Sequence, residues 1–160
     1  MQVSIQEHDF DVAQELAALH HDNGQVGAVV SFIGLVREFS PDASTDSLYL
    51  EHFSGMSERV LEKIITVATQ RWNLLNARVI HRIGHLQAKE RIVLVATAAR
   101  HRGDAFAACE YIIDYLKTDA PFWKKECGAN GSTWLETKDS DLQRMTRWNA
   151  KTELPQGKST

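Results

Sequence analysis

The segment DYLKTDAPFWKKE, at residues 114–126, contains the most distinctive change of local structure in the chain. Its first residues complete a periodic apolar stretch that predicts a long helix over about 103–118. The residues of this helix expected to face inward are Phe106, Cys109, Ile113 and Leu116. Pro121 prevents the helix from continuing far, because proline lacks a backbone N–H and clashes with the preceding turn. Phe122–Glu126 is therefore predicted to be a strand.

Strand-like and helix-like segments alternate along the rest of the chain. A helix is expected after Asp11 as N-cap, with Val12, Leu16 and Leu19 on one face. A second begins near residues 54–57. Its predicted apolar stripe is Met56, Val60, Ile64, Ala68 and Trp72, widened by Leu61 and Ile65. The predicted strands are Val3–Ile5, a mostly buried one over 28–33 ended by Gly34, 48–53, Ala77–Ile83, Ile92–Ala98 and Thr133–Thr137.

The order of these elements, β-α-β-β-α-β-β-α-β-β, mixes hairpins with helices and predicts an α+β fold. The segment from Gly84 to Glu90 is short enough to be a hairpin connection. Residues 38–47 are polar and contain a proline, which indicates an exposed loop. We expect a single domain over residues 1–150 and a frayed tail over 151–160.

Composition excludes several classes of protein. The chain has 160 residues and a formal net charge of −3, which argues against a general polyanion binder, although a local basic pocket remains compatible with it. The N-terminus has no basic region followed by an apolar run, and no apolar stretch approaches the roughly 20 residues of a membrane span. A cytoplasmic location is the expected default, with neither nucleic acid nor membrane as partner.

Lysines are the first candidates for chemistry. Lys117 ends a predicted helix, and Lys124 and Lys125 follow a Pro-aromatic-aromatic turn. A lysine near apolar groups can have a lowered pKa and then act as a base or nucleophile. The alternative is structural, because a lysine in the last helical turn is favoured by the helix dipole and usually faces water.

Two further segments could bind anions. Arg100-His101-Arg102 joins a buried strand to the start of a helix, where free N–H groups bind anions and cations strengthen that binding. A plain polar connection with a cap is the alternative. Arg37 follows a strand and Gly34, and its guanidinium could pair bidentately with phosphate, or it could be a surface arginine at a strand end.

The histidines and cysteines give weaker signals. His52, His81, His85 and His101 lack metal-ligand spacing such as HExxH, so structural or polar roles are expected, and neither a metal nor a cofactor is predicted. The tryptophans are expected to be core or interface anchors. Cys109 should be an inert core thiol. Cys127 follows two lysines, which could activate it, so a persulfide mechanism on Cys127 is an alternative to a lysine mechanism.

The chain resembles the large, catalytic subunit of molybdopterin synthase from about Gly27 to Trp148. Five motifs in order carry the resemblance: GAVVSFIGLVR (27–37), LYLEHFSGM (48–56), VIHRIG (79–84), ATAARHR (96–102) and DYLKTDAPFWKKE (114–126). The last is the most specific of them.

The resemblance implies an α/β-hammerhead-like fold with an added antiparallel subdomain. It implies a homodimer carrying a small ubiquitin-like subunit at each end, together a heterotetramer. The small subunit ends in Gly-Gly, and its C-terminal thiocarboxylate would donate sulfur to cyclic pyranopterin monophosphate to build the dithiolene. An enzyme supplied with sulfur in this way needs no cysteine of its own.

The resemblance also assigns site residues. It places Lys117 and Lys124 at the catalytic centre and Arg37, His101 and Arg102 around the anionic substrate. It adds Lys125 and Glu126 to the same pocket and places Lys138 where it would reach into the partner protomer's site. Alternatives from other classes are a Cys127 persulfide sulfurtransferase, a non-catalytic pterin- or nucleotide-binding module, and an interaction subunit.

Overall fold

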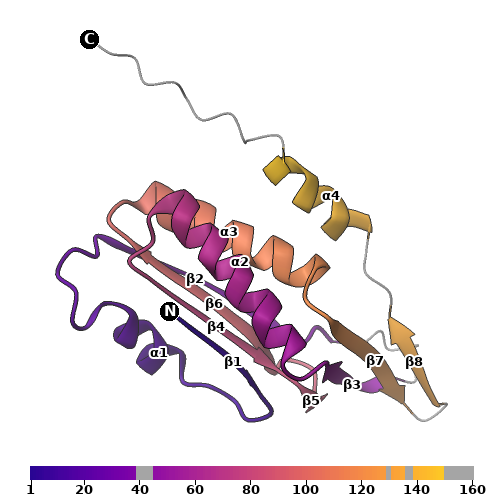
Figure 1. Ribbon diagram of the computed structural model, residues 1–160. Coiled ribbons are helices and arrows are strands. Elements are labelled where there is room, and N and C mark those ends of the chain that lie inside the picture. The colour runs from indigo at the N-terminus through magenta and orange to yellow at the C-terminus, as the bar shows by residue number, and fades with distance from the viewer. Residues whose placement is uncertain (39–44, 129–130, 136–138, 150–160) are drawn as a thin grey trace.

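The computed structural model describes residues 1–38, 45–128, 131–135 and 139–149 (Figure 1). These residues form eight strands and four helices in the order β1 Gln2–Gln6, α1 Val12–His20, β2 Ala28–Leu35, β3 Thr45–His52, α2 Met56–Trp72, β4 Asn76–Arg82, β5 Gly84–Leu86, β6 Arg91–Ala99, α3 Arg102–Thr118, β7 Phe122–Gly128, β8 Gly131–Leu135 and α4 Asp139–Asn149. The predicted α+β class is confirmed.

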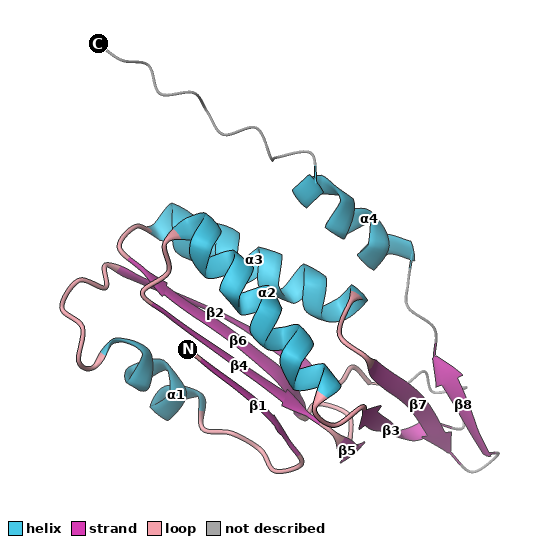
Figure 2. Cartoon of the chain, in the orientation of Figure 1, coloured by secondary structure: helices cyan, strands magenta, loops and turns pink. Residues whose placement is uncertain are grey.

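The first sheet has the strand order β1-β4-β6-β2. Its β1 and β4 are parallel, whereas β6 is antiparallel to both of its neighbours. Figure 2 shows α2 and α3 side by side on one face of this sheet and α1 on the other. The sheet is thus the middle layer of three, which explains why its central strand, β6, is buried from Val93 to Ala99.

Two apolar clusters hold these layers together. Successive residues of β6 point alternately into one cluster and the other. Val93 and Val95 belong to the cluster beneath α2 and α3, while Leu94 and Ala96 belong to the cluster beneath α1. Asp11 caps α1 as predicted, because its carboxylate accepts a hydrogen bond from the Gln14 backbone N–H at 3.1 Å.

The second sheet has the strand order β5-β3-β7-β8, and all of its pairs are antiparallel. It lies at the end of the first sheet, where α3 leads into β7 (Figure 1). One row crosses all four strands on a single face and consists of His85, Tyr49, Lys125 and Trp134. A smaller apolar cluster that includes Leu50 and Leu86 lies beneath this sheet.

Two strand predictions need correction. The segment after β4 is not simply a hairpin loop, because Gly84–Leu86 turns away at a Gly84 φ of 79° and pairs with β3 of the second sheet. The strand over 28–33 does not stop at Gly34, and it is not mostly buried. It continues to Leu35 with a register irregularity. Its side chains alternate in exposure, because Val30 and Phe32 pack against the cluster beneath α2 and α3 whereas Ile33 on the other face is exposed.

The helices differ from prediction in detail. Phe106 was expected to face inward but is 63% exposed, because Ala105, Ala108 and Cys109 form the buried side of the first turns of α3. Met56 is also exposed, and Ser57 takes its place in the buried stripe of α2. Each helix therefore has its buried face rotated from the predicted one at its N-terminal end.

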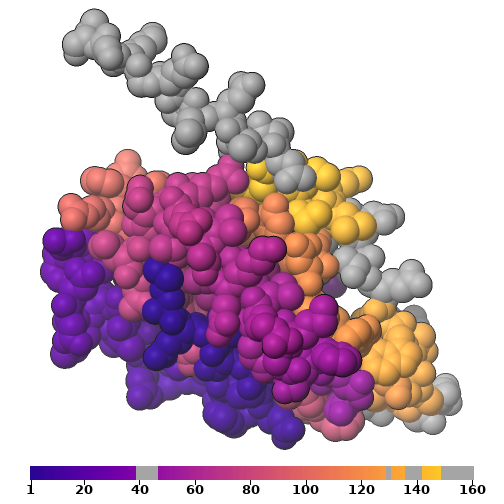
Figure 3. Space-filling model, in the orientation of Figure 1, coloured from indigo at the N-terminus to yellow at the C-terminus, as the bar shows by residue number. Residues whose placement is uncertain are grey.

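A fourth helix, α4, was missed, because its sequence has few apolar residues. It lies against α3 (Figure 3), where Asp114 accepts hydrogen bonds from Trp148 Nε1 at 2.8 Å and from Arg147 Nη2 at 2.7 Å. Trp148 is buried, which fits the expected core or interface anchor, whereas Trp123 and Trp134 are exposed. The predicted loop over 38–47 lies mostly outside the described residues, except that Thr45 already begins β3, and the predicted tail lies outside them entirely.

Candidate functional site

The two candidate catalytic lysines lie on either side of one turn. Lys117 is exposed in the last turn of α3, which ends where the Asp119 N–H donates to the Tyr115 carbonyl at 2.8 Å. Pro121 follows, and β7 then begins with Phe122. Lys124 is the third residue of β7 and is half-buried. The structure thus places one lysine toward solvent and the other closer to the protein interior.

The alternation of β7 separates its functional candidates. Phe122, Lys124 and Glu126 share one face of the strand, since side chains two residues apart point the same way. Lys125 points to the opposite face, where its Nζ lies 5.3 Å from the centre of the Trp134 ring. Within this chain the structure brings Glu126 to the side of Lys124 and places Lys125 away from it.

A buried histidine lies beside Lys124. His81 of β4 is 3% exposed, and its Nδ1 donates to the Arg82 carbonyl at 2.8 Å. Burial lowers the pKa of His81 to about 4, with smaller contributions from the charges of Lys124 and His52. The imidazole is therefore neutral near pH 7. The sequence had assigned His81 a structural or polar role, and this is confirmed, but its place beside Lys124 could not be read from spacing.

The candidate anion-binding residues do not all meet in one chain. His101 is the N-cap of α3 and Arg102 its first residue, and both are exposed. Lys117 lies fifteen residues further along the same helix, which corresponds to about 22 Å at 1.5 Å per residue. His101 and Arg102 are therefore a helix length away from the lysines.

Arg37 lies instead near the C-terminal end of α3, the end that carries Lys117. Helix α3 runs antiparallel to β6, since Thr97 contacts Ala105 and Val95 contacts Cys109. The C-terminal end of α3 is thus near the start of β6, where the end of β2 is also paired. Arg37 follows β2 by two residues and is exposed. Lys138 lies outside the described residues.

The two cysteines are both free thiols. Burial raises the pKa of Cys109 to about 12, and its Sγ lies 3.7 Å from the Val95 carbonyl oxygen, which fits the expected inert core thiol. Cys127 is half-buried in β7, with its Sγ 3.9 Å from the Lys125 carbonyl oxygen.

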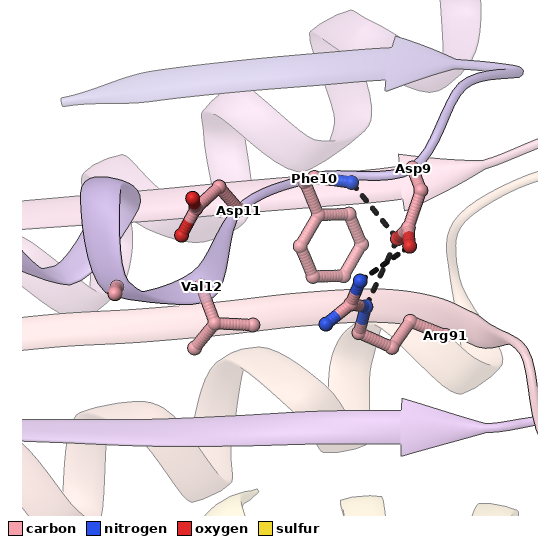
Figure 4. Close-up of a pocket in the computed structure, with 6 residues that line it drawn as sticks. Asp9, Phe10, Asp11, Val12 and Arg91 are labelled. Carbon is pink, nitrogen blue, oxygen red and sulfur yellow. Dashed lines mark hydrogen bonds and ion pairs between the residues drawn. The ribbon is translucent and has the colours of Figure 1, made fainter.

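A surface hollow of about 540 Å³ lies elsewhere, at the entry to α1 (Figure 4). Arg91 projects into it and forms an ion pair with Asp9, whose pKa is lowered by that hydrogen bond. Asp9 also accepts from the Phe10 N–H at 2.8 Å. These contacts fix the segment before α1, so the cation of this hollow already has a partner. Among the described residues, no group of three or more His, Cys, Asp and Glu side chains could hold a metal ion.

Comparison with known proteins identifies the family. The family model described as MoaE protein matches residues 5–119. The chain belongs to the MoaE family. A molybdopterin synthase catalytic subunit from Ralstonia nicotianae is 48% identical over 151 residues, which cover 94% of this chain and 86% of the relative. Another from Vibrio cholerae is 50% identical over 91% of this chain and 97% of the relative.

Solved structures agree with this assignment. A molybdopterin biosynthesis MoaE protein from Burkholderia ambifaria is 44% identical, with a TM-score of 0.79 over 92% of this chain and 98% of that chain. Molybdopterin synthase from Staphylococcus aureus has a TM-score of 0.76 at 34% identity, over 83% of this MoaE-family chain and 96% of that chain. The expected family, and with it the expected sulfur-transferring enzyme, is confirmed.

Among the described residues, no helix is long and apolar enough to cross a membrane.

Proposed function

We propose that this MoaE-family chain transfers sulfur from the C-terminal thiocarboxylate of a small ubiquitin-like subunit to cyclic pyranopterin monophosphate, with Lys117 and Lys124 at the reacting centre. The observation that carries the proposal is the placement of these lysines on either side of one short turn, one exposed and one half-buried. The relatives named molybdopterin synthase catalytic subunit support the reaction class.

The proposed reaction requires the enzyme to position the sulfur donor and the pterin precursor and to transfer protons. The thiocarboxylate sulfur attacks a carbon of the pterin precursor and displaces the oxygen substituent on that carbon, which leaves with a proton. Water then adds to the acyl carbon and cleaves the acyl–sulfur bond, which leaves a carboxylate on the small subunit and a thiolate on the pterin. Both steps develop charge on oxygen. A lysine ammonium group stabilises such an oxyanion and supplies a proton, and a neutral lysine amine takes one up. Because the sulfur arrives on the donor, no step of this proposed reaction uses a cysteine of this chain.

The donor must approach from solvent, and Lys117 is the exposed member of the pair. A complex of subunits 1 and 2 of molybdopterin-converting factor from Helicobacter pylori has a similar fold, with a TM-score of 0.72 at 20% identity over 85% of this chain and 91% of that chain. We propose a small partner subunit for this chain too, with its extended C-terminus reaching the Lys117 side of the turn and the pterin lying toward Lys124 and Glu126.

The phosphate of the substrate needs cations. Arg37 is at the same end of the first sheet as the lysines and is proposed to bind phosphate bidentately. His101 and Arg102 lie about 22 Å away along α3 and cannot serve the same chain's lysines. We propose that they complete the site of a second copy in a homodimer. Lys125, which points away from Lys124, is proposed to contribute in the same way. For Lys138, which is outside the described residues, we keep the proposal that it reaches into the partner protomer's site.

The lysine roles are tested by product formation from purified precursor and thiocarboxylated small subunit. Lys117→Ala and Lys124→Ala are each expected to lower turnover by about 10²–10⁴-fold, the usual cost of losing general acid–base catalysis. Lys63→Ala, at an exposed lysine of α2, is the matched control and should keep the full rate. Near-normal turnover in either active-site variant would refute its assignment.

A further inference from the structure

The turn between the two lysines is held by a buried side chain from another helix. Ser57 lies in the first turn of α2 and is fully buried. Its hydroxyl donates a hydrogen bond to the Pro121 carbonyl oxygen at 3.2 Å, across 64 residues of sequence. A polar group is costly to bury without a partner, so this bond fixes Ser57 and Pro121 relative to each other.

The next residue, Phe122, is held by two histidines from different strands. The His81 ring stacks on Phe122 with centroids 3.9 Å apart and planes at 11°. His52 is the cross-strand partner of Phe122, and their ring centroids are 6.3 Å apart. His81 belongs to the first sheet and Phe122 to the second, so this stack joins the two sheets at the start of β7.

The ring of His81 is itself held firmly. Its Nδ1–H bond to the Arg82 carbonyl sets the tautomer and the ring plane. The charged and titratable groups near it are Lys124 on β7 and His52 on β3, and Glu58 of α2 lies 3.9 Å from His52 Nδ1. A neutral imidazole packs here without adding a positive charge next to Lys124, which a protonated one would do.

These contacts determine where the lysines lie relative to each other. Lys117 precedes Pro121 by four residues, and Lys124 follows Phe122 by two on the same face of β7. Any displacement of Pro121 or Phe122 therefore changes the separation of the two amines. A misplacement of about 1 Å in a catalytic group can cost about a hundredfold in rate.

We propose that Ser57 and His81 are positioning residues for the lysine pair, and that they act by fixing Pro121 and Phe122 from α2 and β4. The inference rests on the proposed roles of Lys117 and Lys124. It assigns to two buried residues a selective effect on the chemical step.

Ser57→Ala and His81→Ala test this inference in the complete complex with thiocarboxylated small subunit and precursor. Each variant should lower the single-turnover rate by about ten- to a hundredfold, while KM for the precursor and Kd for the small subunit change less than about twofold. His81→Phe keeps an aromatic ring against Phe122 and should recover most of the rate lost in His81→Ala. Ser57→Ala removes a single hydroxyl, so it is expected to fold.

Ile80→Val is the matched control, because Ile80 is the fully buried neighbour of His81 on β4 and faces the α1 cluster instead. It should lower stability without changing the rate of the folded protein. Unchanged rates in both Ser57→Ala and His81→Ala, with inactive lysine variants, would overturn the positioning inference alone. Active lysine variants would overturn the proposed function as well.

Discussion

The two ends of α3 both carry cations, but the chain surrounds them differently. At the N-terminal end, Arg100, His101 and Arg102 are all exposed, and Arg100 donates to Gln25 at 2.5 Å. At the C-terminal end, Lys117 leads into a turn fixed by buried groups from α2 and β4. The N-terminal end is an exposed surface, which the proposed second copy would cover. The turn after the C-terminal end is held by contacts within the chain, from Ser57 to Pro121 and from His81 to Phe122.

Mixed dimers give the largest expected effect and test whether the two ends work together across a homodimer. Lys117→Ala and Arg102→Ala chains should each be nearly inactive at low precursor concentration. When the two are co-refolded, random pairing makes half of the dimers mixed, each with one intact site, so about a quarter of wild-type activity should return. The measurement is turnover against mixing ratio.

Recovery in the mixture would mean that Arg102 of one copy acts together with Lys117 of the other copy. If the mixture stays as inactive as its components, Arg102 acts on its own chain or outside the site, and the dimeric site must be abandoned. A mixture of Lys117→Ala with Lys124→Ala is the control. Both lysines belong to the same end, so no intact site can form.

The stability of the protein should depend on pH through His81, the buried histidine near the C-terminal end of α3. The folded pKa of His81 is about 4, below the ordinary 6.5, so in this window the unfolded chain binds a proton that the folded chain does not. The stabilisation is fully present above pH 6.5 and is lost as the pH falls toward 4. The loss from His81 is expected to reach at most about 3 kcal/mol.

Denaturant unfolding at pH 7.5 and pH 4.5 measures this loss, with His81→Phe as the comparison. The variant has no proton to bind at this position, so its stability should fall less than that of the wild type over the same window. An equal fall in both proteins would mean that other groups govern the acid response. His101→Phe, at the exposed end, should behave like the wild type.

The smallest effect is expected from the cysteines. The Cys109→Ser, Cys127→Ser double variant should keep most of its turnover, because in the proposed reaction the sulfur arrives on the small subunit. Some stability should be lost, since Cys109 is buried in the cluster beneath α2 and α3. Loss of sulfur transfer in a well-folded double variant would contradict the lysine mechanism and favour the alternative of a persulfide on Cys127.

Local sequence was sufficient for much of the fold. Apolar periodicity located three helices, and Pro121 correctly separated α3 from β7. It failed for α4, whose burial depends on Trp148 meeting Asp114, a contact between residues 34 apart that no local pattern encodes. It also failed for β5, because three residues joining a distant strand carry no periodicity of their own.

The candidate site was predictable in its residue types but not in its arrangement. The motif that contains Lys117 and Lys124 could be recognised from the sequence, and alternation along β7 then separates Lys124 from Lys125. The roles of Ser57 and His81 depend on long-range contacts with Pro121 and Phe122. A serine at a helix start and a histidine in a strand are too common for sequence alone to assign such roles.

The attachment of α4 to α3 has a consequence for the order in which the protein can be completed during synthesis. Asp114 lies one helical turn before Lys117 and is 4% exposed, and its carboxylate is held by Arg147 and Trp148. A chain made from its N-terminus contains all of α3 before residue 148 is added. Until then the Asp114 carboxylate lacks these partners and is better left in water. The end of α3 that carries Lys117 can therefore reach its final packing only after residue 148 has been added.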